Sequence, residues 1–248
     1  MSYNPMSLAG KTILVTGASS GIGKAIAIEC SKLGASLVCT GRNGERLQET
    51  MAILEGAGHT AVTADISTDE GLALLAGDLP KLDGAAMVAG INKSLPTAFL
   101  KRDEISRILD TNLLAPMLLQ AALLKQHKLR KGASVVYMAS ASAVAGQTGQ
   151  AMYAASKGAL VSYMKVVAHE LGPKLIRANC ILPGMVETPL IHRGTLDEEM
   201  HAKDMQNYPL RRYGQPEDVA HLAAFLLSDA AAWITGSCYA VDGGLTRR

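Results

Sequence analysis

The chain has 248 residues, of which 48% are hydrophobic and 19% are charged, and its formal net charge is +2. This composition supports a large core and argues against long disordered segments, and the lack of a dense Lys/Arg cluster argues against a nucleic-acid partner. No apolar run reaches the roughly 18 residues that a membrane span needs, and the start, MSYNPMSLAGK, lacks the order of a signal peptide, so we expect a cytoplasmic protein with no membrane partner.

Short apolar runs alternate with amphipathic runs along the whole chain. The first kind predicts buried strands over 12–16, 36–40, 60–64, 84–89, 134–139, 177–182 and 238–241. The second kind predicts helices over 23–33, 45–55, 103–125, 153–171 and 216–227. This alternation indicates an α/β fold, a doubly wound, Rossmann-like parallel sheet with helices on both faces. We predict a single domain over 1–248, with a helical excursion over the site at about 187–215, where Pro, Gly and charges mix.

The first predicted strand runs directly into a glycine-rich turn, Gly17-Ala-Ser-Ser-Gly21-Ile-Gly23, and a predicted helix follows. A helix N-terminus offers free N–H groups and a positive dipole end, which suit phosphate. Glycines let the backbone turn tightly and approach a pyrophosphate closely. The spacing is GxxxGxG rather than the more familiar GxGxxG. The order of strand, turn and helix predicts a dinucleotide site; the alternative is a glycine-rich turn without a ligand.

The end of the second predicted strand indicates which dinucleotide is bound. An NAD site usually has an acidic residue there, to accept hydrogen bonds from the ribose hydroxyls. This chain has Thr40-Gly41-Arg42-Asn43 instead. Arg42 can pair with a 2′-phosphate through its planar guanidinium, and no carboxylate repels that group. We therefore predict NADP(H) rather than NAD(H), although Arg42 could also be an ordinary solvated loop arginine.

One polar residue, Asn112, interrupts the long apolar helical pattern before residue 125. A buried Asn is costly unless it is hydrogen-bonded. One interpretation is that its side chain only hydrogen-bonds a neighbouring strand.

Three further polar residues suggest redox chemistry on a carbonyl or hydroxyl group. Tyr153 and Lys157 are four residues apart and share one face of a predicted helix, and Ser140 ends a strand 13 residues before the tyrosine. Hydride transfer to a carbonyl leaves an alkoxide, which a tyrosine hydroxyl can protonate as a general acid. A nearby ammonium should lower the tyrosine pKa from its usual value of about 10. Ser140 is the expected second donor to the substrate oxygen.

These features together resemble the short-chain dehydrogenase/reductase family over almost the whole chain. The matching motifs are Thr16-Gly17-Ala-Ser-Ser-Gly21-Ile-Gly23, Asp65-Ile66, Asn112 in DTNLLAP, Ser140, Tyr153-x-x-x-Lys157, Pro183-Gly184 with Thr188, and Val241-Asp-Gly-Gly. Within the family the chain is most similar to 3-oxoacyl-[acyl-carrier-protein] reductases, because of the segment YPLRRYGQPEDVA at 208–220.

The resemblance implies a role for each matched position. The implied cofactor contacts are Gly17, Ser19, Ser20, Gly21, Ile22, Gly23, Arg42, Asp65, Ile66, Ala89, Gly90, Tyr153, Lys157, Pro183, Gly184, Val186 and Thr188. The implied catalytic residues are Ser140, Tyr153, Lys157 and Asn112. The Asn112 carbonyl would hold a relay water, which needs a distorted helix, and Pro116 lacks the N–H that would otherwise bond that carbonyl. The resemblance also implies a small-molecule carbonyl or alcohol substrate and a homotetramer built through the long helices and the last strand.

One departure from the family pattern leaves alternatives open. The family commonly has Asn-Asn-Ala-Gly after the fourth strand, whereas this chain has Met87-Val88-Ala89-Gly90. Either an apolar pair packs there, or the cofactor pocket is altered. A catalytically silent NADP(H)-binding sensor or scaffold is therefore the alternative function. A sugar-nucleotide epimerase or dehydratase is disfavoured by the glycine spacing and the chain length.

Two other residue types carry weaker predictions. The four cysteines are scattered without a CxxC pair, which favours a reducing compartment and buried structural thiols over a disulfide framework. The six histidines show no pairing at metal-ligand spacing, so no metal site is expected.

Overall fold

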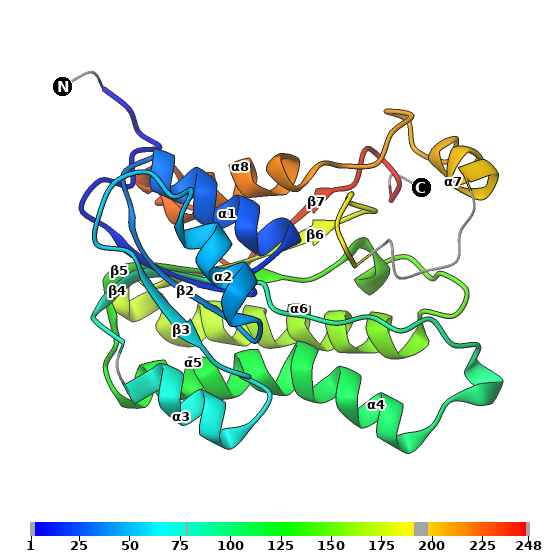
Figure 1. The fold of residues 1–248 in the computed structure, drawn as a ribbon, viewed down its shortest axis with the longest axis horizontal. Helices are drawn as coiled ribbons and strands as arrows, with labels where there is room; N and C mark the ends of the chain where they lie inside the picture. Colours follow the sequence, from blue (N-terminus) through cyan, green and yellow to red (C-terminus); the bar gives the residue numbers. More distant parts are fainter. Residues whose placement is uncertain (1–2, 78, 191–197, 247–248) are drawn as a thin grey trace.

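A computed structural model describes residues 3–77, 79–190 and 198–246 and is built on one parallel β-sheet (Figure 1). Its strands are β1 (Thr12–Thr16), β2 (Ser36–Gly41), β3 (Thr60–Thr63), β4 (Leu82–Met87), β5 (Leu129–Met138), β6 (Arg177–Pro183) and β7 (Cys238–Val241). They lie in the order β3-β2-β1-β4-β5-β6-β7, and every neighbouring pair is parallel. The predicted doubly wound α/β fold is confirmed.

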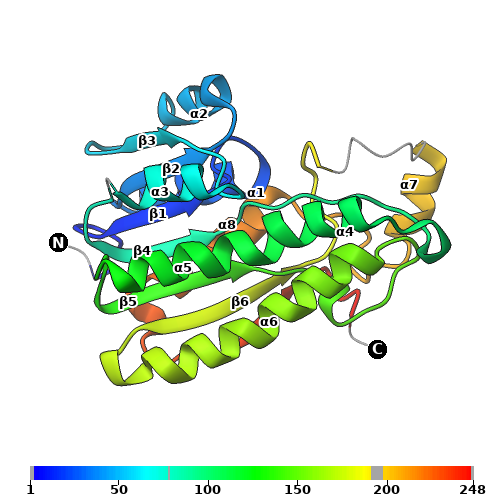
Figure 2. The same cartoon turned by 90° about the horizontal axis from the view of Figure 1, so that it is seen from below.

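Helices cover both faces of the sheet (Figures 1 and 2). One face carries α1 (Gly21–Lys32), α2 (Gly44–Met51) and α8 (Pro216–Leu227). The other carries α3 (Asp69–Gly77), α4 (Arg102–Leu109), α5 (Ala115–Lys125) and α6 (Ala151–Leu171). Alternate side chains of the central strands enter two separate apolar cores, one beneath each layer, since successive strand residues point to opposite faces. Leu14 of β1 belongs to the α6-side core, and its neighbour Val15 to the α1-side core.

Besides end shifts of one to four residues, the observed elements differ from the predicted ones in three ways. The predicted helix 103–125 is interrupted by a π-helical turn, Asp110–Leu114, which separates α4 from α5. The strand predicted at 134–139 begins earlier, at Leu129, because its exposed first half still pairs with β4 through Leu82. Helix α3 was not among the helices predicted.

The α4–α5 run is also the one helical stretch, among the described residues, that has the length and apolar character of a membrane span. It covers Arg102–Lys125, 24 residues, and an 18-residue window within it has a mean hydropathy of 1.2. Its buried residues Leu119 and Leu123 lie in the same core as Leu160 of α6 and Leu75 of α3. Packing in this core therefore accounts for the buried apolar side chains of the run, whereas Leu114 and Leu118 are exposed.

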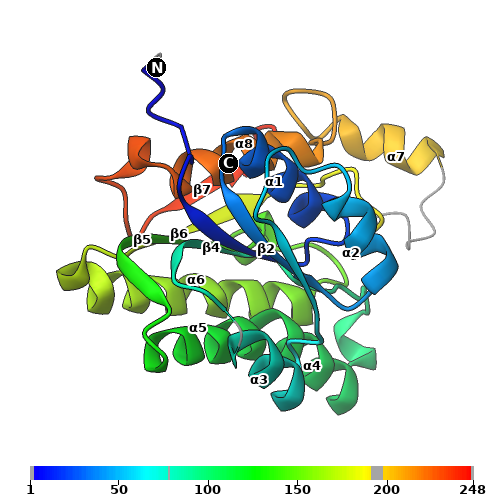
Figure 3. The ribbon, with the colours of Figure 1, turned by 60° about the vertical axis from the view of Figure 1, so that its left-hand side comes forward.

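The predicted excursion at 187–215 is pinned where it leaves and rejoins the sheet layer. Val186 and Gly214 form an isolated parallel bridge, and the Glu187 N–H donates to the Gly214 carbonyl at 2.9 Å. Between them lies α7 (Glu198–Met205), which projects beyond the sheet (Figure 3). Residues 191–197 of the predicted excursion lie outside the described residues.

Candidate active site

The predicted site residues gather at the carboxyl ends of the strands, around the point where strand order reverses. The chain places β2 and β3 on one side of β1, and β4 to β7 on the other. Parallel α/β sheets bind ligands in the crevice at such a switch point. Here the turn after β1 touches the segment after β4: a Cβ placed on Gly17 would lie 3.0 Å from the Ala89 Cα.

The glycine turn has no room for side chains at two positions. Gly17 has φ +70°, a conformation that favours glycine, in addition to its contact with Ala89. A Cβ on Gly23 would lie 2.3 Å from the Gly17 carbonyl oxygen, so the first turn of α1 packs directly against the glycine turn. Ser20 is the N-cap residue of α1, yet its side chain makes no capping hydrogen bond. The turn therefore leaves a helix N-terminus facing the crevice, as a bound pyrophosphate requires.

Thr16 is a site residue that the sequence reasoning left out of its cofactor set. Its Oγ1 accepts hydrogen bonds from the Val88 N–H at 2.9 Å and the Ala89 N–H at 3.1 Å. Met87 is buried in the α6-side core, and Val88 packs against the α1-side core. Of the two interpretations of the Met87-Val88 departure, the structure shows the apolar packing, and Thr16 satisfies the backbone amides.

Arg42 and Asp65 lie together at the ends of β2 and β3. The Arg42 Nη1 is 3.7 Å from the Asp65 Oδ2, and the two side chains are 58% and 40% exposed. Burial raises the pKa of the Asp65 carboxyl, but hydrogen bonds from Ser67 and the charge of Arg42 outweigh it and bring the pKa below its usual value. Ser19 borders the same spot, because a Cβ on Gly41 would lie 3.0 Å from its hydroxyl oxygen. An exposed, loosely paired guanidinium is available here to a phosphate.

The segment after β6 reaches back to the glycine turn. A Cβ on Gly21 would lie 3.1 Å from the Thr188 Cγ2, so Thr188 rests against the turn. Gly184 is equally confined, since a Cβ added there would lie 3.0 Å from the Cα of Asp242, the residue that follows β7. Val186 and Thr188 are both buried. The glycine turn and the segment after β6, which both supply implied cofactor contacts, are therefore in direct contact.

Ser140, Tyr153 and Lys157 converge as predicted. Ser140 is buried at the end of β5 and hydrogen-bonds the hydroxyl of Tyr153, which is half-buried. The Lys157 Nζ lies 5.7 Å from the centroid of the Tyr153 ring and donates to the Met138 carbonyl at 2.7 Å. A hydroxyl pair and a buried ammonium thus share one end of β5.

The protonation behaviour of this group differs from one expectation. Burial raises the pKa of Tyr153, and the hydrogen bond from Ser140 opposes that rise only in part. The prediction that Lys157 lowers this pKa is wrong for the structure described, because the ammonium bonds the Met138 carbonyl instead of the phenol. Burial also lowers the pKa of Lys157 to about 8. Tyr153 is therefore a protonated phenol near neutral pH, as a general acid must be.

Asn112 bonds the segment that follows β4 rather than a neighbouring strand. It lies buried in the π-helical turn, where the Ala115 N–H reaches the Asp110 carbonyl five residues back. Its Oδ1 accepts from the Ile91 N–H at 2.8 Å, and its Nδ2 donates to the Ile91 carbonyl at 2.9 Å and to the Ser156 Oγ at 3.2 Å. The side chain thereby ties the π turn to the residue after Gly90 and to α6. Ser156, which makes the second of these links, was not predicted.

Gly90 lies where these elements meet. A Cβ on Gly90 would lie 3.2 Å from the Asn112 Oδ1 and 3.4 Å from the Lys157 Nζ. The expected helix distortion is present, and Pro116 supplies no N–H to the Asn112 carbonyl.

The donor set fits a dinucleotide rather than a metal ion. It combines a helix N-terminus, close glycines, hydroxyls and an ammonium, which are groups that bind phosphates and ribose hydroxyls. Among residues 3–77, 79–190 and 198–246, no cluster of three His, Cys, Asp or Glu side chains is arranged to hold a metal.

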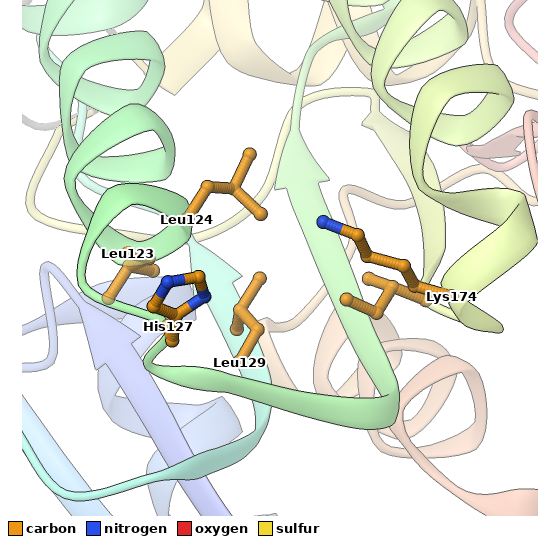
Figure 4. A pocket seen from close by; sticks show the side chains of 6 residues that line it. Leu123, Leu124, His127, Leu129 and Lys174 are labelled. Atoms are coloured by element: carbon orange, nitrogen blue, oxygen red, sulfur yellow. The ribbon is translucent and has the colours of Figure 1, made fainter.

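Two cavities lie at different distances from this site. One of about 300 Å³ adjoins the first turn of α6, next to Tyr153. Its lining residues are Pro96, Thr97, Gly146, Gln147, Thr148, Gly149, Gln150, Ala151 and Ala154. The other, of about 160 Å³, lies where β5 begins, at the opposite end of the strand from Ser140, and the Lys174 side chain extends over it (Figure 4). Only the first adjoins the helix that carries Tyr153.

Comparison with known proteins agrees with this geometry. Residues 17–246 match a family model described as enoyl-(acyl carrier protein) reductase. The 3-oxoacyl-[acyl-carrier-protein] reductase FabG of Rickettsia felis is 34% identical over 96% of this chain and 98% of its own. Human dehydrogenase/reductase SDR family member 4 is 33% identical over 97% of this chain and 89% of its own.

One solved structure is also closely similar. It comes from Beutenbergia cavernae, is assigned as an NAD(P)-dependent gluconate 5-dehydrogenase and carries NADP at low occupancy. Its TM-score is 0.90 at 33% identity, over 99% of this chain and all of the other.

Proposed function

We propose that this chain, which belongs to the short-chain dehydrogenase/reductase family of oxidoreductases, reduces the carbonyl group of a small-molecule substrate with NADPH. The observation that carries the proposal is the convergence of Ser140, Tyr153 and Lys157 beside the glycine turn. The bound nicotinamide would supply the hydride, and the family uses such cofactors.

In the proposed mechanism, Tyr153 donates the proton. Its raised pKa keeps the phenol protonated, so the hydroxyl can protonate the developing alkoxide. Ser140 donates a hydrogen bond to the same substrate oxygen and stabilises its negative charge. The raised pKa of Tyr153 thus keeps the phenol in the protonated form from which carbonyl reduction starts.

Lys157 and Asn112 are proposed to position the cofactor and return the proton. Lys157 would bond the nicotinamide ribose from its place beside Gly90. The Asn112 carbonyl, with no N–H from Pro116, is free to accept a water that links the lysine to solvent. The Asn112 side chain has a positioning role, since its two hydrogen bonds hold the Ile91 backbone in place.

The preference for NADP(H) over NAD(H) is proposed to come from Arg42. Its exposed guanidinium and the NADP seen in the Beutenbergia relative support this assignment. Changing Arg42→Asp should weaken NADPH binding relative to NADH by at least about tenfold, because a carboxylate repels the 2′-phosphate. Arg46→Asp, four residues on in α2, matches the change in charge and should leave the ratio near the wild-type value. Equal effects of the two variants would contradict a specific role for Arg42.

We propose 3-oxoacyl thioesters as the first substrate class to test. The family model's description and the Rickettsia relative's name both refer to acyl carrier protein. We also propose that the chain forms a single domain over 1–248 and that the segment 187–215, pinned by Val186 and Gly214, closes over the substrate. Its closeness to the cofactor turn through Thr188 supports this role.

A cytoplasmic homotetramer is proposed for the assembly. Apolar side chains are exposed at Leu114 of the π-helical turn, Leu118 of α5 and Val166 of α6, and Trp233, just before β7, is 99% exposed. Exposed apolar groups of this kind mark contact surfaces. Light scattering on the wild type should give four chains per particle, and Leu118→Glu should reduce that number; a wild-type monomer contradicts the proposal.

The test of the proposed activity is NADPH consumption across acyl-thioester, steroid, sugar and quinone carbonyls. Turnover should appear for at least one class and fall by about 10²–10⁴-fold in Tyr153→Phe. NADPH binding without turnover across the panel would favour a silent sensor instead. Activity that persists in Tyr153→Phe would overturn the assigned general acid.

A further inference from the structure

A buried hydroxyl outside the predicted site joins α2 to the glycine turn. Thr50, the second-last residue of α2, is fully buried. Its Oγ1 donates a hydrogen bond to the Ala18 carbonyl at 3.0 Å and lies 3.1 Å from the Arg46 carbonyl. The Arg46 carbonyl has the N–H of Thr50 as its partner within the helix. Over the described ranges no backbone N–H donates to the Ala18 carbonyl, so the Thr50 hydroxyl is the group that satisfies it.

The bond to Thr50 fixes the direction of the next amide in the glycine turn. All peptide bonds in the described part of the chain are trans. In a planar trans peptide unit the C=O and the N–H that follows it point in opposite directions. Because the Ala18 carbonyl is turned toward Thr50, the Ser19 N–H points away from α2. Ala18 is buried and Ser19 is partly exposed, so this N–H is presented to the crevice.

Helix α2 is fixed at both of its ends. At its start, the Asn43 side chain accepts a hydrogen bond from the Arg46 N–H at 2.9 Å, directly after Arg42. Near its middle, Leu47 is buried in the α1-side core. At its end, Thr50 holds the glycine turn. The helix therefore places the guanidinium proposed for the 2′-phosphate at one end and supports the turn proposed for the pyrophosphate at the other.

We propose that Thr50 is a positioning residue for the dinucleotide, whose hydroxyl holds the Ala18 carbonyl so that the Ser19 N–H faces the cofactor phosphates. The inference rests on the proposed binding of NADPH. Without the hydroxyl, the buried Ala18 carbonyl loses its partner, and the peptide unit turns to reach water. That rotation takes the Ser19 N–H away from the ligand. Since NADPH and NADH share the pyrophosphate, Thr50 acts on both cofactors, whereas Arg42 acts on the 2′-phosphate alone.

The experiment compares three proteins by fluorescence titration with NADPH and with NADH. Thr50→Val keeps the shape of the side chain but removes the hydroxyl, and both dissociation constants should rise by about tenfold. Their ratio should stay at the wild-type value, in contrast to Arg42→Asp. Thr50→Ser, which keeps the hydroxyl, should bind as the wild type does. In steady-state kinetics Thr50→Val should raise KM for NADPH and leave kcat unchanged, because saturating cofactor restores the complex.

Ser31 of α1 provides a matched control for a merely structural effect. It is also a buried hydroxyl, which donates to the Ile28 carbonyl at 2.7 Å and accepts the Glu55 N–H at 3.0 Å, but it does not bond the glycine turn. Ser31→Ala should lower the midpoint of urea unfolding and leave both dissociation constants unchanged. Thr50→Cys, whose thiol is a weak donor, should bind with an affinity between those of the Ser and Val variants.

The outcomes separate this inference from the proposed function. A wild type that binds neither dinucleotide contradicts the proposed function, and the role of Thr50 falls with it. A wild type that binds both, with wild-type affinity in Thr50→Val, overturns the role of Thr50 alone. The same holds if Ser31→Ala weakens binding as much as Thr50→Val does, or if Thr50→Ser does not restore it. If Thr50→Val does not fold, wild-type affinity in Thr50→Cys overturns the role.

Discussion

The hydrogen bonds of Asn112 give the sharpest test of how the site is held together. Replacing Asn112 with leucine keeps a side chain of similar size but removes its amide. Two buried backbone groups, the Ile91 N–H and C=O, then lose their partners. Ser156 keeps its other hydrogen bond, to the Tyr153 carbonyl at 2.7 Å.

The magnitude follows from those two groups. Leaving one buried polar group unsatisfied costs about 1–3 kcal/mol, so Asn112→Leu should lower the free energy of unfolding by about 2–6 kcal/mol. Ser156→Ala removes the third bond of Asn112 and the bond that Ser156 donates to the Tyr153 carbonyl, but leaves both Ile91 groups paired, and should cost about 1–2 kcal/mol. A typical domain has only about 5–15 kcal/mol in total, so the larger loss is a substantial share.

Urea unfolding of the three proteins at one chain concentration measures these differences, since assembly makes stability depend on concentration. Steady-state kinetics on the folded variants should show a raised KM for NADPH in Asn112→Leu, because Asn112 holds Ile91 next to Gly90, an implied cofactor contact that lies beside Lys157. A loss below about 1 kcal/mol in Asn112→Leu, or one no larger than in Ser156→Ala, would refute the clamp.

Three further changes test other parts of the structure. Because burial lowers the pKa of Lys157 to about 8, its ammonium loses a proton as pH rises through that value. The value of kcat/KM for carbonyl reduction should then fall about tenfold for each pH unit above it. A fall that begins only near the pKa of a free lysine contradicts this. In Gly23→Ala the added methyl group has no room beside the Gly17 carbonyl. The affinity for NADPH, measured by fluorescence titration, should therefore drop by at least about tenfold. An unchanged affinity would show that the turn accommodates the methyl group. Arg177→Met removes donors to the carbonyls of Leu226, Ser228 and Ile234 and should cost about 2–4 kcal/mol in urea unfolding while sparing KM; an unchanged midpoint would show that these carbonyls find other partners.

The sequence predicted the sheet well because each strand is a short apolar run and each turn has its own chemistry. The bounds of α8, with Pro216 at its first position and Asp218 completing a capping box, agree with the prediction to the residue. The helix predicted across Asn112 was broken because Pro116 cannot donate the amide that a continuous α-helix needs there.

Features that depend on contacts between distant segments of the chain could not be predicted from the sequence. Thr16 bonds amides 72 and 73 residues away, and Cys180 meets Cys238, which is exposed and not buried as expected, only through strand register. The pKa direction of Tyr153 depends on how deeply the ring is buried and on where the Lys157 ammonium finds an acceptor. None of these follows from spacing along the chain, because each arises where the fold brings separate segments together.

Lys157 shows how the fold itself prepares the site for an anionic cofactor. Its ammonium is buried against the Met138 carbonyl, and within the described residues no carboxylate forms an ion pair with it. A charge that is poorly solvated by water and only partly compensated by a carbonyl dipole raises the local positive potential. The α1 N-terminus adds a positive dipole end to the same crevice, and Arg42 adds a cation at its far side. A phosphate-bearing ligand should therefore stabilise the folded chain, because its negative charge offsets the free-energy cost of burying the Lys157 ammonium. The glycine turn and Lys157 would then both be stabilised by the same bound ligand.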